Sequence, residues 1–232
     1  MNNSIALVTG ANTGIGKEIA RQLVAAGLTV YAAARDAERG ERAVAELGRG
    51  TRPLMLDVTD ADSIAAAASQ VPDLDILVNN AGISLDGKTP DKETAESFRW
   101  VYETNVFGVV AVTNAFLPAL RRSEHPRIVN ISSGTGSLTL AAEREAGGFA
   151  AYRSSKAALN ALTIFYAHTL GAHGFKVNAL APGLRRTGLN AVAAASGGDP
   201  AEAAAGAVYL ALLPDDGPNG QFLSWDGTQV PW

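Results

Sequence analysis

The feature that most constrains the fold is a series of short apolar runs separated by longer stretches rich in Ala, Leu, Glu and Arg. The runs are nearly continuous in hydrophobicity, which is typical of strands covered on both faces, and the intervening residues are strong helix formers. This alternation predicts a doubly wound α/β fold with a parallel sheet of about seven strands. The predicted strands are residues 5–9, 29–34, 53–56, 76–78, 128–131, 177–181 and 222–224, and the clearest helices are residues 18–26, 93–120 and 155–170.

The length of 232 residues suits one large α/β domain, and no repeat or charged linker divides it. We therefore expect a single domain over residues 1–232. The stretch at 188–200, with Ser196, Gly197 and Gly198, carries turn residues and little to bury. This composition predicts a mobile flap within about residues 184–200.

Composition excludes several function classes. The net charge is −4 with scattered Lys and Arg, which disfavours nucleic acid as a partner, and the absence of Cys excludes disulfides, thiolate metal sites and thiol nucleophiles. His125, His168 and His173 share no ligand spacing, so no metal is expected. No apolar run approaches the roughly 18 residues that span a bilayer, and the first strand leaves no room for a signal peptide. We expect a cytoplasmic protein without membrane contact.

A glycine-rich turn, TGANTGIG at residues 9–16, joins the first strand to a helical pattern. Glycines there permit a tight turn and let backbone approach a pyrophosphate over the helix N-terminus. An ordinary glycine-rich turn is the alternative. A P-loop is excluded because Ala11 stands at its first glycine and Glu18 where Ser or Thr should hold Mg²⁺.

The spacing T-G-x-x-x-G-x-G resembles the short-chain dehydrogenase/reductase superfamily rather than the G-x-G-x-x-G of other dinucleotide-binding folds. The resemblance covers essentially the whole chain, and it implies a Rossmann-fold oxidoreductase that moves a hydride between nicotinamide and a substrate. Further matches follow in the family's order: Leu56-Asp57-Val58, Asn79-Asn80-Ala81-Gly82, Asn105, Ile131-Ser132-Ser133, Tyr152 with Lys156, and Pro182-Gly183 with Thr187.

Reduction of a carbonyl needs a hydride, a proton donor and a group that polarises the oxygen. Tyr152 and Lys156 are four residues apart in a helical segment, so they share one face, and the ammonium should favour the phenolate. The resemblance implies Tyr152 as the proton donor and acceptor, Ser133 on the substrate oxygen, Lys156 on the nicotinamide ribose, and Asn105 holding a water that links Lys156 to solvent.

Each of these residues has a structural alternative. Tyr152 and Lys156 by themselves could be a pair on the surface of a helix. Ser133 could cap or start a turn, and Asn105 could be a buried structural amide. Asn79 could lock neighbouring strands, which leaves cofactor contact to the three residues after it. The resemblance implies cofactor binding by Gly10, Asn12, Thr13, Gly14, Ile15, Gly16, Arg35, Asp57, Val58, Asn80, Ala81, Gly82, Tyr152, Lys156, Pro182, Gly183 and Thr187.

The end of the second strand distinguishes the two nicotinamide cofactors, because an acid there binds the ribose 2′-OH and an Arg accommodates a 2′-phosphate. Ala34 occupies the acid position and Arg35 follows it, which predicts NADP(H) over NAD(H). Asp36, about 20 residues beyond the glycines, is the alternative acid. Thr13 stands where many NADP-using relatives have a basic residue.

The loop at residues 135–149 is roughly six residues longer than in many short relatives. Leu138, Leu140 and Phe149 are expected to line a substrate pocket, and Glu143, Arg144 and Glu145 to form a solvated tip. Longer extensions of this kind occur in monomeric carbonyl reductases, which the chain also resembles at residues 34–36.

The leading interpretation is a carbonyl reductase acting on a ketone or aldehyde, reversible as an alcohol dehydrogenase, with a small-molecule substrate. A 3-oxoacyl-thioester reductase is the nearest alternative, for which Arg185 and Arg186 are the only basic candidates near the flap. A noncatalytic NADP sensor is more distant, because it would be expected to lack Tyr152 or Lys156. Both a monomer and a homo-oligomer, dimer or tetramer, built through helices 93–120 and 155–170 remain open.

Overall fold

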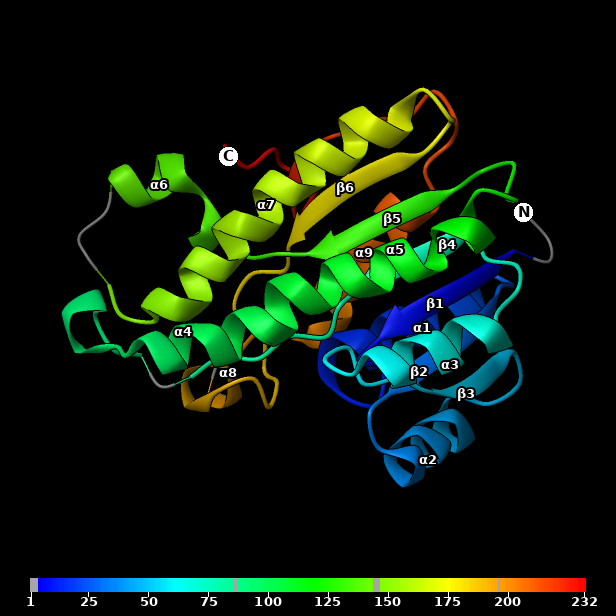
Figure 1. Ribbon diagram of the computed structural model, residues 1–232, viewed down its shortest axis with the longest axis horizontal. Helices are drawn as coiled ribbons and strands as arrows, with labels where there is room; N and C mark the ends of the chain where they lie inside the picture. Colours follow the sequence, from blue (N-terminus) through cyan, green and yellow to red (C-terminus); the bar gives the residue numbers. More distant parts are fainter. Residues whose placement is uncertain (1–3, 86, 144–146, 196) are drawn as a thin grey trace.

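A parallel sheet forms the centre of the molecule in the computed structural model, which describes residues 4–85, 87–143, 147–195 and 197–232. Within these ranges seven strands pair in the order β3-β2-β1-β4-β5-β6-β7, all parallel (Figure 1). Chain order reverses between β1 and β4, the point where doubly wound folds bind ligands. The strands are β1 (Ile5–Thr9), β2 (Thr29–Ala34), β3 (Thr51–Met55), β4 (Ile76–Asn79), β5 (Arg127–Ile131), β6 (Lys176–Ala181) and β7 (Phe222–Ser224).

Helices cover both faces of the sheet, which confirms the predicted doubly wound α/β fold. One face carries α1 (Gly14–Ala25), α2 (Ala37–Leu47) and α9 (Pro200–Ala211). The other carries α3 (Ala61–Gln70), α5 (Gly108–Leu120) and α7 (Ala150–Gly171), with α4 (Ala95–Tyr102) leading into α5 (Figure 1). No helix in the described part of the chain is long and apolar enough to cross a membrane.

The continuous apolar runs have a simple cause, because successive side chains of a strand point to opposite faces. In β1, Leu7 packs among the residues of α3, α5 and α7, whereas Ala6 and Val8 pack against α1 and α9. All three are fully buried. A strand covered by helices on both sides therefore cannot alternate between apolar and polar residues.

The predicted helix at 93–120 is divided in the structure. Thr94 caps α4 by accepting a hydrogen bond from the Ser97 N–H at 3.1 Å. A π-helical turn at Glu103–Phe107 then separates α4 from α5. Short π segments inside helices are frequent at functional sites, and this one contains Asn105.

A short helix that the sequence did not predict, α8 (Ala191–Ala195), lies within the flap and buries Ala193. Asn190 caps this helix through Oδ1, which accepts from the Ala193 N–H at 2.8 Å. The Asn190 amide also reaches Ser84 Oγ at 3.3 Å, which ties the flap to the loop after β4. Ser196 lies outside the described residues.

The loop at 135–149 contains a 3₁₀ turn at Gly134–Gly136 and the helix α6 (Leu138–Ala142). Thr139 binds the Trp232 carbonyl through its N–H at 2.9 Å and its hydroxyl at 2.7 Å. Leu138 is 70% exposed, and Leu140 packs against the cluster of residues around Phe222. Glu143 is exposed as predicted, whereas Arg144 and Glu145 lie outside the described residues.

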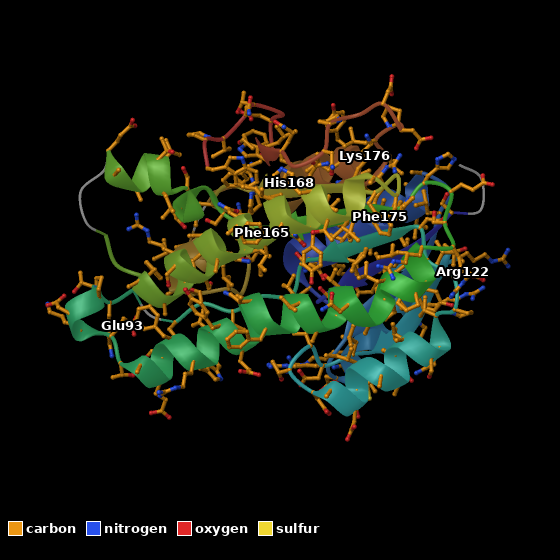
Figure 2. All side chains as sticks on the ribbon, turned by 45° about the horizontal axis from the view of Figure 1, so that its top comes forward. Glu93, Arg122, Phe165, His168, Phe175 and Lys176 are labelled. Atoms are coloured by element: carbon orange, nitrogen blue, oxygen red, sulfur yellow. The ribbon has the colours of Figure 1, made fainter. Side chains whose placement is uncertain are left out.

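Several large aromatic side chains remain exposed on the side of the molecule formed by α4, the π turn and α7. They include Trp100, Phe107 and Phe165. Figure 2 labels Phe165 and His168, both exposed, on the outer side of α7.

Candidate active site

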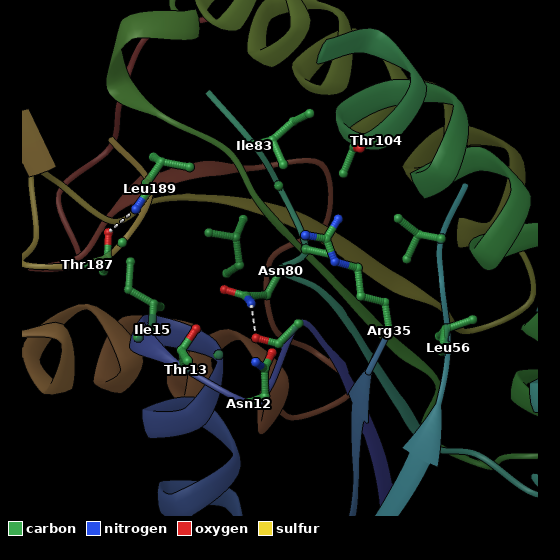
Figure 3. Close-up of a pocket in the computed structure, with 18 of the residues that line it drawn as sticks. Asn12, Thr13, Ile15, Arg35, Leu56, Asn80, Ile83, Thr104, Thr187 and Leu189 are labelled. Atoms are coloured by element: carbon green, nitrogen blue, oxygen red, sulfur yellow. Dashed lines mark hydrogen bonds between the residues drawn. The ribbon is translucent and has the colours of Figure 1, made fainter. Parts of the chain in front are cut away.

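The glycine turn between β1 and α1 accommodates no larger residue at its last position. Gly10 and Gly14 have φ values of +64° and +56°, and a Cβ on Gly16 would lie 2.3 Å from Asn80 Nδ2 and 2.5 Å from the Gly10 carbonyl. Asn80 Nδ2 donates to the Thr9 carbonyl at 2.8 Å and to that of Gly10 at 3.3 Å (Figure 3). The end of β4 therefore holds the turn against the helix N-terminus, an arrangement that binds anions.

A first cavity of about 410 Å³ opens above this turn, at the carboxyl ends of β1, β2 and β4. All the predicted cofactor residues except Gly183 line it. Figure 3 shows Arg35 reaching across it from the end of β2. Lining residues that the sequence did not single out include Arg39, Thr59, Ile83, Thr104 and Leu189.

The two candidates at the end of β2 have different environments. Asp36 caps α2, because its Oδ1 accepts from the Arg39 N–H at 2.9 Å. Arg35 is exposed and lies near Asp57, whose pKa is lowered by hydrogen bonds from the Thr59 N–H and hydroxyl and, to a smaller extent, by the Arg35 charge. Both side chains line the first cavity, but one oxygen of the Asp36 carboxylate is engaged by its own helix, whereas Arg35 reaches across the cavity (Figure 3).

The helix α7 brings Tyr152 and Lys156 to one face, as their spacing predicts. Lys156 is 4% exposed, and its Nζ donates to the Ile131 carbonyl at 2.8 Å. The same Nζ lies 5.7 Å from the centre of the Tyr152 ring. A Cβ on Gly82 would lie 3.5 Å from it, at ordinary van der Waals distance.

The electrostatics of the pair differ from the expectation that Lys156 lowers the pKa of Tyr152. Burial raises the pKa of Tyr152 to about 12, and a hydrogen bond with Ser133 acts in the opposite direction. Burial also lowers the pKa of Lys156 to about 8. The prediction was wrong because loss of water disfavours both charged forms, and the ammonium is turned toward the Ile131 carbonyl.

The side chains of Ser133 and Asn105 have different surroundings. Ser133 Oγ accepts from the Thr135 N–H at 3.2 Å and lies 2.9 Å from the Thr135 hydroxyl. Asn105 is fully buried, and its amide exchanges hydrogen bonds with the backbone of Ile83 at 2.9 and 3.0 Å and donates to Ser155 Oγ at 3.0 Å. The Asn105 side chain therefore makes the contacts of a structural amide directly beside the cavity wall.

A second cavity of about 380 Å³ adjoins the first. Its walls include Ser133, Phe149, Gly183 and the flap residue Leu184. Leu138 and Leu140 do not line it, contrary to expectation, because α6 turns one to solvent and the other toward β7. The two cavities share Ile15, Tyr152, Pro182, Thr187 and Leu189.

Arg185, a candidate for binding a carrier-bound substrate, is buried at the base of the flap, where it also lines the second cavity. It is 7% exposed, its guanidinium lies 4.2 Å from the centre of the Trp225 ring, and it pairs with Glu202 at 3.1 Å. Its Nε donates to the Pro182 carbonyl at 2.9 Å. Arg185 thus anchors the base of the flap.

Among the side chains that the structure describes, no group of three His, Asp or Glu is placed to hold a metal ion.

Comparison with known proteins agrees with the geometry. A model of the family described as short chain dehydrogenase matches residues 4–196. "Short-chain dehydrogenase anuI" of Penicillium roqueforti is 40% identical over 200 residues, which cover 79% of each chain. The 3-oxoacyl-[acyl-carrier-protein] reductase FabG of Escherichia coli is 36% identical over 188 residues, covering 79% of this chain and 74% of the relative.

Among solved structures, the NADPH-bound carbonyl reductase from chicken fatty liver is similar over 100% of both chains, with a TM-score of 0.88 and 31% identity. The fold, the glycine turn and these matches point to one family. The chain belongs to the short chain dehydrogenase family of oxidoreductases.

Proposed function

We propose that residues 1–232 act as one domain that reduces the carbonyl group of a ketone or aldehyde with NADPH, or oxidises the corresponding alcohol. The observation that carries this proposal is the position of Tyr152 in the wall shared by the two cavities. A cofactor in the first cavity and a substrate in the second would meet there. Of the five shared residues, Tyr152 and Thr187 carry hydroxyl groups, and the phenol of Tyr152 is by far the more acidic, so Tyr152 is the one suited to proton transfer.

The first cavity suits a dinucleotide. The glycine turn offers backbone N–H groups to a pyrophosphate, and the absence of a side chain at Gly16 lets Asn80 and the Gly10 carbonyl pack against the helix N-terminus. A nicotinamide cofactor, when bound, supplies the hydride. The remaining predicted cofactor residues surround the same space, whereas Gly183 lies in the wall of the second cavity.

Tyr152 is suited to give a proton to the oxygen of the reduced substrate. A phenol with a pKa of about 12 is neutral at physiological pH, and an alkoxide is a stronger base than a phenolate. Ser133, whose hydroxyl is beside that of Tyr152, would orient and polarise the carbonyl oxygen. Lys156 would stabilise the phenolate left behind and hold the ribose hydroxyls.

Asn105 is assigned a positioning role within this proposal. Its amide fixes the backbone of Ile83, which lines the first cavity, and joins it to Ser155, which immediately precedes Lys156. A water between Asn105 and Lys156 remains a prediction from the family resemblance.

The preference for NADP rests on Arg35. Its guanidinium lines the first cavity with Arg39 nearby, and the competing carboxylate of Asp36 is engaged in capping α2. Two guanidinium groups suit a 2′-phosphate better than a ribose hydroxyl. The similar carbonyl reductase binds NADPH, which supports the same choice.

A 3-oxoacyl-thioester reductase remains the second candidate, and the specific observation in its favour is the similarity to the reductase of Escherichia coli. Of the two basic candidates near the flap, Arg185 is buried against Trp225 and paired with Glu202, whereas Arg186 is exposed. A carrier-bound substrate would have to rely on Arg186, or on Arg153, which lines the second cavity.

Self-association is a further part of the proposal. Exposed Trp100, Phe107 and Phe165 favour contact between two copies of the chain through α4 and α7. Sedimentation equilibrium would measure the mass in solution, and a monomer at all concentrations would contradict this assignment.

The test of catalysis is a panel of ketones, aldehydes and 3-oxoacyl thioesters followed by NADPH absorbance. Tyr152→Phe should abolish turnover while NADPH binding, measured by calorimetry, is retained. Tyr209→Phe, at an exposed position on α9, is the matched control and should behave as the wild type. Activity retained by Tyr152→Phe would overturn the mechanism.

The cofactor assignment has its own test. Arg35→Ala should lower the ratio of kcat/KM for NADPH to that for NADH by about tenfold or more, as expected for loss of a charge-assisted hydrogen bond. Arg42→Ala, which alters an arginine of α2 outside the cavity, should leave the ratio unchanged. A wild-type preference for NADH would contradict the assignment.

A further inference from the structure

Phe149 has an unusual backbone conformation immediately before α7. Its φ and ψ angles are 65° and 36°, and among the described residues it is the one non-glycine residue with positive φ. This region is unfavourable for a bulky residue, and such conformations persist only where the surroundings hold them. Phe149 lies three residues before Tyr152, so the strain is at the edge of the site.

Contacts with the loop after β4 explain how the conformation is held. A Cβ on Gly87 would lie between 2.5 and 2.8 Å from three carbons of the Phe149 ring, so the ring rests directly on the Gly87 backbone. A Cβ on Gly148 would lie 2.3 Å from the Gly87 carbonyl oxygen. The Ala150 N–H donates to the Lys88 carbonyl at 3.3 Å. Two glycines therefore allow the backbones to touch and seat the ring.

The Phe149 ring lines the second cavity and does not pack in the hydrophobic core. Phe149 belongs to none of the core clusters formed by the described residues, yet it lines the cavity that contains Tyr152 and Ser133. An aromatic side chain outside the core and in a strained conformation indicates a binding role.

The flap supplies the other apolar walls of this cavity. Leu184 and Val192 are 57% and 52% exposed, and Leu189 and Ala193 line the cavity with them. Exposed apolar side chains that converge on a concave surface mark a site for an apolar ligand. The hydroxyls of Ser133 and Tyr152 lie in the same cavity and could bind one carbonyl, while the apolar side chains would contact the rest of the molecule. Arg153 and Arg185 also line the cavity, and Arg185 is engaged by Trp225 and Glu202.

We propose that the second cavity selects ketones and aldehydes whose carbonyl carries an aromatic or bulky apolar group, and that Phe149, seated on Gly87, is the specificity-determining residue against which this group packs. The inference rests on the proposed function and adds the substrate class. A volume of about 380 Å³ falls within the range of small-molecule sites. Acetophenone is a suitable probe, and 2-butanone provides a small ketone for comparison.

The experiment compares Phe149→Gly and Gly87→Ala with the wild type. Phe149→Gly removes the ring and accepts the left-handed conformation, whereas Gly87→Ala keeps the ring but displaces it. Both variants should lower kcat/KM for acetophenone by about 30-fold and change the value for 2-butanone by less than about threefold. Tyr209→Ala removes an exposed ring on α9 that lines neither cavity, and it should alter neither value.

Direct binding separates failure of this inference from failure of the proposed function. Acetophenone binding to the NADPH-loaded protein is followed by saturation-transfer NMR, and it should be strong in the wild type and weak in Phe149→Gly. Equal binding to both proteins, or equal losses for the two ketones, would overturn the role of Phe149. A wild type that binds acetophenone through Phe149 but reduces no carbonyl would overturn the proposed function alone. Thermal unfolding checks that each variant folds.

Discussion

The lowered pKa of Lys156 predicts a specific dependence of stability on pH. The side chain is 4% exposed, and burial moves its pKa from 10.5 to about 8. Between these values the unfolded chain binds more protons than the folded chain, so the free energy of unfolding should rise with pH. The penalty for the buried ammonium is fully present below about pH 8 and is progressively relieved as the pH rises from there toward 10.5.

The size of the effect follows from the shift. A difference of about 2.5 pKa units corresponds to roughly 3 kcal/mol, of which roughly 2 kcal/mol should be recovered between about pH 7 and about pH 9.5. Lys156→Met removes the titrating group but keeps a long apolar side chain. The free energy of unfolding of the wild type minus that of Lys156→Met should therefore increase by about 2 kcal/mol over this range.

Urea unfolding of the ligand-free proteins, followed by circular dichroism at several pH values, measures this difference. Titration of Tyr152 affects the free energy of unfolding of both proteins, so it largely cancels in the difference between them. Lys92→Met, at an exposed position, is the control and should run parallel to the wild type. A difference between wild type and Lys156→Met that stays constant within about 0.5 kcal/mol would refute the desolvation of Lys156.

Two further substitutions test the turn and the flap. Gly16→Ala should weaken NADPH binding by about tenfold or more, because the new methyl group would collide with Asn80 and the Gly10 carbonyl. Calorimetry would measure it, and unchanged affinity would contradict the close approach. Arg185→Lys should destabilise the protein by about 1–2 kcal/mol in urea unfolding, since it loses the planar stack on Trp225 and much of the hydrogen bonding. Unaltered stability would argue against Arg185 as the anchor of the flap.

Much of the fold could be predicted from local patterns. The first, second and last strands begin and end where the apolar runs do, at residues 5–9, 29–34 and 222–224. These runs report burial on both faces of a sheet, which is a property of consecutive residues. The division of the helix at 93–120 could not be predicted, because the π turn at Glu103–Phe107 lies within a continuous helical pattern.

The candidate active site could likewise be predicted only in part from the sequence. The glycine turn and the Tyr152–Lys156 pair depend on short spacings, and the structure brings them to one cavity as expected. The pKa of Tyr152 could not be predicted from spacing, because its direction depends on how much water surrounds the phenol and where the ammonium points.

The sequence by itself determined the layered α/β fold, the family and the residues that could perform proton transfer, since each depends on neighbours within a turn or a strand. Only the tertiary structure decided that Asp36 caps a helix, that Leu140 faces β7 rather than the substrate cavity, and that Phe149 rests on Gly87. The physical reason is that these contacts join backbone and side chains distant in sequence or turned by an irregular loop. No periodic pattern specifies which surfaces meet when such segments pack.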